Sequence, residues 1–439
     1  IRAESLKGPF DVKGSLKYAG QMVQVQGHAD TAPDDMSALS VRLKAQARPA
    51  GVDLDYAGIV GLQAPYELQG ETSLAIDSLS STLQSAGVTA SVPVEKLALK
   101  GLLTASSAGV DLRDAVFQVG DAEMTGFVGA GLKPMTIKAD LKSKSPINLD
   151  DMILQSPKTQ GKTAAPEAGA WAAFLPPSLS LPAGFTMDIA LQAPGMVYRK
   201  QIYNQISLTL KNEGKIFSAQ FDAVDIPGKG SASVKGQMAF ATKASDPKTG
   251  GDIYRDPSLV ADIDVSSQNI PKTLQAVASV EGVAFPSSWK TGAFQGRVKA
   301  AGDRFEIQDA RLRVADTSAQ LSGSLAQGER GGRGKLSVDA AVDKLNLDTL
   351  QDDNSAAAGG GDFAGTLKAL SFPYDLSFDV GVQELQTQGQ KISGLRAQGE
   401  LLADSLTFSN LSAQDYAGAA LKLSGGIGSL KALSGIDIK

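Results

Sequence analysis

The sequence predicts an all-β protein with few short helices, built around an antiparallel sheet. Apolar and polar residues alternate with a period of two along most of the chain, and Gly, Asp and Asn separate the alternating runs at hairpin spacing. The whole pattern then recurs about 190 residues later, which predicts two tandem modules.

The clearest predicted strands lie in the second half of the chain. In DRFEIQDARLRV the apolar residues Phe305 and Ile307, and then Leu312 and Val314, alternate with polar neighbours. Similar alternation covers residues 39–47, 335–343 and 375–382. Such runs are typical of antiparallel strands that have one apolar face and one wet face.

Two short helices interrupt the strands. The first is expected from Ser78, a good N-cap, to Gly87. The second is expected from Asn269, with Pro271 in its first turn, to Gly282. Both contain Thr-Leu-Gln, so the helices belong to the repeated pattern.

The repeat defines the predicted domains. The tripeptide Asn-Leu-Asp stands at 148–150 and at 346–348, and a run rich in Ala, Gly and polar residues follows each copy. A hairpin phrase bounded by Gly recurs at 101–126, 296–323 and 399–425, and a related phrase spans 210–236. We therefore expect the end of a preceding β-repeat at 1–50 and modules at 51–250 and 251–439, with mobile linkers at about 155–170 and 351–362.

Composition excludes several classes of function. The net charge of −5 argues against nucleic acid, and no apolar run reaches the roughly 18–20 residues of a membrane span. The absence of Cys removes disulfides and thiolate chemistry, and the single His28 lies in phase with polar residues. The chain begins and ends within the alternating pattern, so we expect a segment of a longer protein.

No active site, metal site or cofactor is expected, and the protein is predicted not to be an enzyme. The run RGGRGKLS at 330–337 lacks the spacing of a phosphate loop and is read as a hairpin turn. Asn410 starts a glycosylation sequon only by pattern, and the carboxylates are dispersed. Trp171, Phe174 and Leu175 leave two interpretations open: contact with a membrane surface, or a plug on the protein's own apolar face.

The apolar side of the strands is the candidate site, because strands with one apolar face must cover that face. A sandwich core, a curved groove for apolar ligands and a self-filled solenoid are the alternatives; scarce aromatics and many Ala and Gly favour the groove. The groove candidates are Leu208, Leu210, Phe217, Phe305, Ile307, Leu312, Val314, Leu321, Leu336, Val338, Leu376, Phe378, Val380, Leu406, Phe408, Leu421 and Leu423.

The order of these motifs resembles the AsmA-like family of bacterial envelope proteins. The resemblance rests on TLQAVASVEG, GDRFEIQDARLRVADTSAQLSGSL, VDKLNLDTL, a loose linker, and the run from PYDLSFDVGVQELQTQGQ to AGAALKLSG. It covers nearly all of the chain from about Val52, twice over. It implies an elongated, curved sheet that forms an apolar groove, in a periplasmic protein anchored to the inner membrane through a segment outside this chain.

The resemblance also implies a function. Phospholipids would be the ligands, and the groove would conduct them between the inner and outer membranes for outer-membrane homeostasis. One alternative is an assembly factor for outer-membrane proteins with a protein-filled β core. A hydrolase or carbohydrate-binding β-protein is the other, and it requires a tight cluster of carboxylates.

Overall fold

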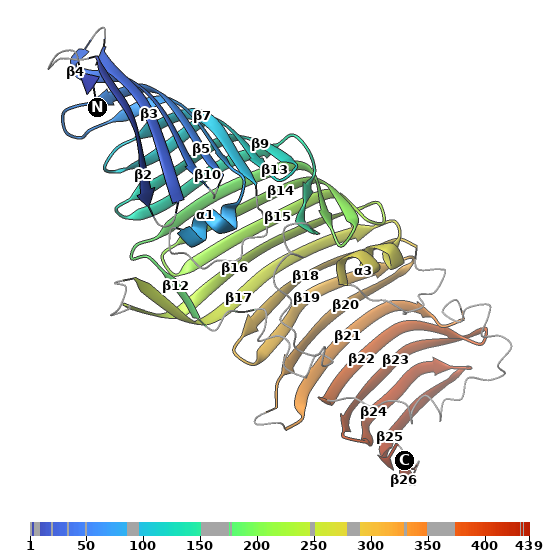
Figure 1. Cartoon of the computed structure of the whole chain (residues 1–439). Helices are drawn as coiled ribbons and strands as arrows, with labels where there is room; N and C mark the ends of the chain where they lie inside the picture. The colour runs from blue at the N-terminus through green and yellow to red at the C-terminus, as the bar shows by residue number, and fades with distance from the viewer. Residues whose placement is uncertain are drawn as a thin grey trace. The chain divides into compact units, whose positions relative to one another are not determined.

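A computed structural model describes residues 2–3, 9–18, 21–32, 35–48, 51–85, 96–150, 175, 178–245, 251–278, 290–328, 332–348, 374–430, 432 and 434–439 (Figure 1). Strands and two short helices make up the secondary structure of these residues, which confirms the all-β prediction. Both predicted linkers, and Trp171 and Phe174, lie outside the described residues. The described chain falls into two compact units, and it passes between them within β12 (Ser178–Leu181), β15 (Ile216–Ile226), β16 (Gly230–Ser245) and β17 (Asp252–Ser267).

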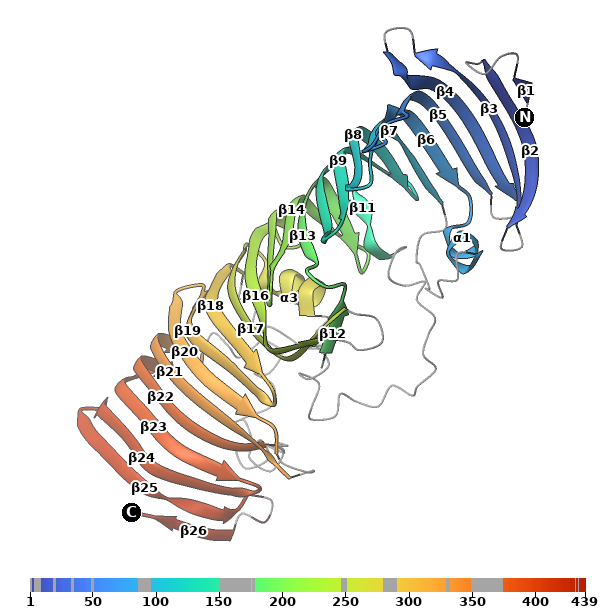
Figure 2. The ribbon, with the colours of Figure 1, turned by 90° about the vertical axis from the view of Figure 1, so that its left-hand side faces the viewer.

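The first unit is an open sheet whose strands follow chain order (Figure 2). Each strand from β1 to β10 pairs antiparallel with the next, β10 pairs in parallel with β13, and β13 pairs antiparallel with β14. The short β11 also runs parallel to β13. The bounds are β1 Arg2–Ala3, β2 Phe10–Tyr18, β3 Gln21–Ala32, β4 Asp35–Arg48, β5 Val52–Gly61, β6 Leu68–Ile76, β7 Leu97–Ala105, β8 Gly109–Val119, β9 Ala122–Leu132, β10 Met135–Ser143, β11 Ile147–Asn148, β13 Thr186–Tyr198 and β14 Gln201–Glu213.

The second unit repeats this plan from β17 onward. Its strands pair antiparallel in chain order, except that β21 and β22 are parallel. The bounds are β18 Gly292–Ala301, β19 Arg304–Val314, β20 Thr317–Ala326, β21 Gly334–Asn346, β22 Tyr374–Thr387, β23 Gln390–Leu402, β24 Ser405–Tyr416, β25 Ala419–Ser429 and β26 Ser434–Ile438.

The prediction of an antiparallel sheet is therefore wrong at one position in each unit, and the sheet is mixed. The physical reason is the long linker after each Asn-Leu-Asp tripeptide. A parallel neighbour requires the chain to return to the end at which the previous strand began, which takes a dozen residues or more. Residues 151–174 and 349–373 supply that length. The repeated linker therefore indicates a parallel pair of strands, which the alternation pattern alone does not.

The repeated Asn-Leu-Asp tripeptide forms hydrogen bonds at the connection between each pair of parallel strands. Asn148 accepts a hydrogen bond from the backbone N–H of Asp150, and Asn346 accepts one from Asp348 in the same way. The Asp150 carboxylate then accepts two backbone N–H groups at the β13–β14 turn, and that of Asp348 accepts two at the β22–β23 turn. The tripeptide therefore recurs because it fastens the same connection twice.

The repeated hairpin phrase contains a β-bulge. Asp114 in β8 and Asp309 in β19 both have positive φ, at 48° and 50°, and the strand register shifts beside Gly101 and Gly296 on the partner strands. A Cβ at Gly296 would lie only 3.1 Å from the Cβ of Ala310. These Gly residues therefore allow the close strand approach at a bulge, which bends the strand.

Both predicted helices form at strand ends. Helix α1 spans Leu79–Ser85, and Ser78 Oγ accepts the N–H of Ser81. Helix α3 spans Ile270–Ala278, and Asn269 Oδ1 accepts the N–H of Lys272. The predicted N-cap at Ser78 and the predicted start at Asn269 are thereby confirmed. The predicted stops at Gly87 and Gly282 lie outside the described residues.

Candidate functional site: the apolar faces of the two units

One side of the sheet in the first unit carries continuous rows of apolar residues that cross the strands, here called rungs. Residues that occupy paired positions place their side chains on the same side of a sheet, so the strand registers define this apolar face. One rung consists of Leu39, Val60, Leu68, Ala105, Val110, Ala130, Ile137 and Met187.

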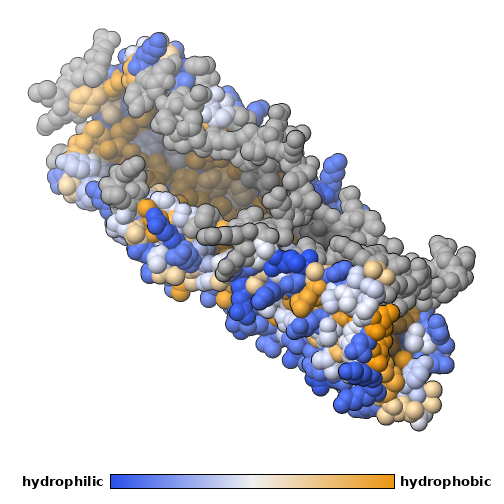
Figure 3. Space-filling view, turned by 90° about the horizontal axis from the view of Figure 1, so that it is seen from below, coloured by the Kyte–Doolittle hydropathy of each residue, from blue (hydrophilic) through white to orange (hydrophobic). Residues whose placement is uncertain are grey.

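The apolar face of the first unit is hollowed (Figure 3), with hydrophobic residues gathered inside the hollow and mainly polar residues outside. Exposure along β8 follows this shape. Val110 near the strand end is 39 % exposed, Leu112 is 7 % exposed, and Ala115 at the bulge is fully buried. The middle of the strand therefore forms the floor of the hollow, and its end forms part of the wall.

The second unit carries the same kind of apolar face. One rung consists of Phe305, Leu325, Leu336, Leu376, Leu401, Leu406, Ile427 and Ile436. The next consists of Ile307, Gly323, Val338, Phe378, Gly399, Phe408, Gly425 and Ile438. None of these side chains is charged, so a ligand in contact with them meets only hydrocarbon.

The structure places the predicted groove residues from Phe305 onward together on the apolar face of the second unit. Val314 is buried, Leu421 is exposed, and the others are half-buried. Leu208 and Leu210 lie on the apolar face of the first unit, opposite Leu191 and Ile189. Phe217 is half-buried in β15, a strand that contributes no residue to the rungs described above. That these residues bind lipid stays a prediction.

Aromatic rings over glycines are a feature that sequence reasoning missed. A Cβ at Gly399 would lie 2.8 Å from the Phe378 ring, and the Phe378 and Phe408 rings meet edge to face with centroids 6.0 Å apart. In the first unit the Tyr56 side chain covers Gly58, and burial raises the pKa of its phenol. The sequence signal for this feature was a Gly at a position where the alternation calls for an apolar side chain, as at Gly58 and Gly399.

One end of the second unit's apolar face is closed by its own chain. Leu430, in the turn after β25, is almost fully buried and packs with Leu401 against Leu376, Leu406 and Ile427. Its backbone N–H donates to the Asp404 carbonyl at 2.7 Å. The first rung therefore ends in a small protein-filled core, whereas the residues around Val338 remain half-buried.

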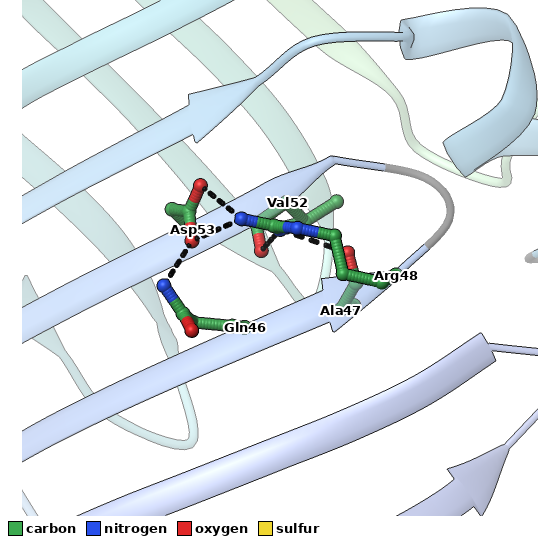
Figure 4. Close-up of polar contacts among 5 residues, drawn as sticks. All are labelled: Gln46, Ala47, Arg48, Val52 and Asp53. Atoms are coloured by element: carbon green, nitrogen blue, oxygen red, sulfur yellow. Dashed lines mark hydrogen bonds and ion pairs between the residues drawn. The ribbon is translucent and has the colours of Figure 1, made fainter.

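The opposite face of each sheet is polar and braced by ion pairs between neighbouring strands. In the first unit, Arg48 Nη2 lies 2.9 Å from both carboxylate oxygens of Asp53, and Gln46 also donates to Asp53 (Figure 4). In the second unit, hydrogen bonds from Arg396 and Gln398 hold the pKa of the Asp379 carboxyl below its usual range. These exposed pairs link neighbouring strands on the side of the sheet opposite the rungs.

The polar face of the second unit carries a cleft. A cleft of about 480 Å³ in the second unit lies over Ala341 and Gly381 and is bordered by Asp339, Asp379 and Arg396, which carry both signs of charge. Within the described ranges no group of three or more His, Cys, Asp or Glu residues is placed to hold a metal ion. In the same part of the chain no helix is long and apolar enough to cross a bilayer.

Comparison with known proteins gives no match to a family model, a curated protein or a solved structure. The strand registers and the burial of the rungs are therefore the features of the chain that bear on its function.

Proposed function

We propose that the apolar faces of the two units bind phospholipid acyl chains and conduct lipids between the inner and outer membranes. In this proposal the chain is the periplasmic segment of an AsmA-like protein anchored to the inner membrane by a segment outside it. Its role is to maintain the outer membrane, and it performs no chemical reaction.

The observation that carries the proposal is that uncharged rungs line one face of the sheet in each unit. The extensive contacts between described elements within each unit join strands that are neighbours in the sheet, so the residues of a rung belong to one layer. A water-soluble sheet does not leave rows of Leu, Val and Phe open to solvent without a ligand or a covering segment.

The energetics suit transfer rather than storage. Each buried CH₂ group contributes about 0.8 kcal/mol, so a lipid with ~30 methylenes gains ~24 kcal/mol on entering an apolar trough. The lipid leaves a bilayer interior of similar polarity, so the net free energy is close to zero. A path of this kind holds lipids without trapping them.

The buried Leu430 core favours a second candidate, an assembly factor for outer-membrane proteins whose apolar face is filled by its own chain. The two candidates differ in what a charge on the apolar face does. On a lipid-bearing face an added carboxylate stays hydrated and blocks binding. In a filled core the same carboxylate is buried without a partner and unfolds the unit.

The test is native mass spectrometry with lipid extraction on the chain prepared without detergent. We expect several phospholipids per chain, lost in Val338→Asp while the circular dichroism of the sheet and its melting temperature stay unchanged. Gln320→Asp is the matched control, because Gln320 is exposed on the polar face, opposite Arg311 and Ala341.

Two outcomes would overturn the proposal. A folded native chain that carries no lipid and takes none from vesicles would show that protein fills the apolar face. Unfolding of Val338→Asp with an unaffected Gln320→Asp control would support the assembly factor instead.

A further inference from the structure

Five exposed apolar side chains gather along one rim of the first unit. They are Leu62 and Tyr66 in the β5–β6 loop, Val110 at the start of β8, and Leu132 and Met135 at the β9–β10 turn. Leu62, Tyr66 and Leu132 are 50 %, 65 % and 54 % exposed. We call these five residues the apolar rim.

Backbone contacts show that the three hairpin ends are neighbours. Leu68 at the end of the first loop pairs with Ala105, where β7 ends. The N–H of Leu132 donates to the carbonyl of Ala108 at 2.9 Å, which joins the second and third ends. Leu62 follows β5 and Met135 begins β10, and five strand steps of ~4.8 Å separate these strands, so the rim extends over about 24 Å.

The apolar rim is continuous with the apolar face. Val110 pairs with Ala130 in the rung described above, and Leu132 pairs directly with Met135 at the outer margin of the same face. No polar row therefore separates the hollow of the first unit from solvent at these turns.

Other described hairpin turns have a different composition. Their central residues are small or polar: Gly120-Asp121, Arg199-Lys200, Gly302-Asp303, Ala315-Asp316 and Gln388-Gly389. Single exposed apolar residues flank some of them, as Ile202 does beside Arg199-Lys200. The rim's own β7–β8 and β9–β10 turns, Ser106-Ser107-Ala108 and Lys133-Pro134, are also small or polar at their centres. What distinguishes the rim is that three successive hairpins at one edge of the sheet each carry exposed apolar residues in or beside their turns.

We propose that the apolar rim contacts the surface of a phospholipid bilayer and that acyl chains enter the hollow of the first unit across it. Leu, Tyr and Met at loop ends are side chains that insert into the headgroup region of a membrane. The rim loops contribute one cation, Lys133, and one anion, Glu67, so contact depends on apolar insertion rather than on anionic lipids. Lipid entry rests on the proposed function, whereas membrane contact does not.

The test is flotation of the complete chain with phosphatidylcholine vesicles. We expect the native chain to float, with little dependence on salt. Leu62→Ser, Tyr66→Ser and Leu132→Ser combined should lower the bound fraction at least about tenfold. Because these side chains are exposed, the melting temperature should not change.

The matched control is Ile202→Ser, Val224→Ser and Leu402→Ser combined, since these residues are equally exposed but lie away from the rim. This control should float like the native chain. A native chain that does not float, or a control that loses binding as strongly as the rim variant, would refute membrane contact through the apolar rim.

Lipid content separates this inference from the proposed function. The rim variant should retain the lipids bound during expression but exchange them with vesicles more slowly. Val338→Asp should float normally but carry less lipid. A native chain that floats through its rim yet never holds lipid would refute the proposed function and lipid entry, and would leave membrane contact standing. A rim variant that exchanges lipid at the native rate would refute entry across the rim.

Discussion

The carboxylate of Asp348 accepts the backbone N–H of Gly389 at 2.9 Å, across 41 residues of sequence. The other oxygen of this carboxylate accepts the N–H of Gln388 at 2.5 Å. Asp150 makes the equivalent pair of contacts to Arg199 and Lys200 in the first unit. One carboxylate thus holds the turn that follows each parallel pair of strands.

Removal of this carboxylate should destabilise the second unit. Asp348→Ala leaves two turn N–H groups without their charged acceptor, and we expect a loss of about 1–2 kcal/mol in the free energy of unfolding. Urea denaturation followed by circular dichroism measures the change. The control is Asp316→Ala, an exposed turn carboxylate with no hydrogen bond to a described residue. Equal effects of the two substitutions would contradict the role of Asp348.

A substitution at the equivalent turn of the first unit should stabilise it. Lys200 has a φ of 60°, a left-handed conformation that costs a residue with a Cβ about 1 kcal/mol. Lys200→Gly keeps the N–H that donates to Asp150, so we expect a gain of about 0.5–1 kcal/mol. Lys138→Gly, in the extended β10, should lower stability instead. A loss of stability in Lys200→Gly would mean that the strain is not relieved.

Acid should weaken the second unit through Asp379. Arg396 lowers the pKa of the folded Asp379 carboxyl, so the unfolded chain binds this proton more readily than the folded chain. The stabilisation is complete above the unfolded pKa of about 3.9 and is lost as the pH falls through the lower folded pKa. Arg396→Gln should therefore reduce the loss of stability below about pH 4.

Urea melts at several acidic pH values measure this dependence. Arg313→Gln is the control, because no ion pair joins Arg313 to a described carboxylate. If the free energy of unfolding falls equally steeply with pH in the native chain and in Arg396→Gln, Asp379 does not contribute to the acid sensitivity.

The glycine pair beneath Tyr56 should tolerate no side chain. A Cβ at Gly70 would lie 2.4 Å from the Ala57 carbonyl oxygen and 2.5 Å from the Gly58 Cα, so β5 and β6 would have to separate. We expect Gly70→Ala to cost about 1–3 kcal/mol by thermal or urea unfolding. Gly14→Ala in β2, where a Cβ meets nothing within 4 Å, should be neutral or slightly stabilising. A neutral Gly70→Ala would show that the strands can shift freely.

The alternation of apolar residues was sufficient to predict the strands and the face on which most candidate residues lie. Phe305, Ile307, Leu312 and Val314 do share one face, although their spacing slips by one residue. Asp309 explains the slip, because a bulge adds one residue to the strand. Alternation could not reveal the bulge, since register depends on the partner strand.

The remaining features depend on contacts between distant segments. The parallel pairing of β21 with β22 depends on the path of a linker, and the burial of Leu430 depends on four strands that precede it. The apolar rim escaped prediction for the same reason. Leu62 and Leu132 are 70 residues apart, and only the strand order brings their hairpins together.

The parallel pairing in the second unit has a consequence for dividing the chain. From β17 to β26, each antiparallel pair of successive strands lies on one side of residues 349–373, and the parallel register from Gly334 to Asn346 joins the two sides. A cut between residues 349 and 373 would thus break no antiparallel pair within the unit. The two fragments separated there are suited to a complementation experiment. Asp348 would lie on one fragment, and the turn N–H groups of Gln388 and Gly389 that it accepts would lie on the other.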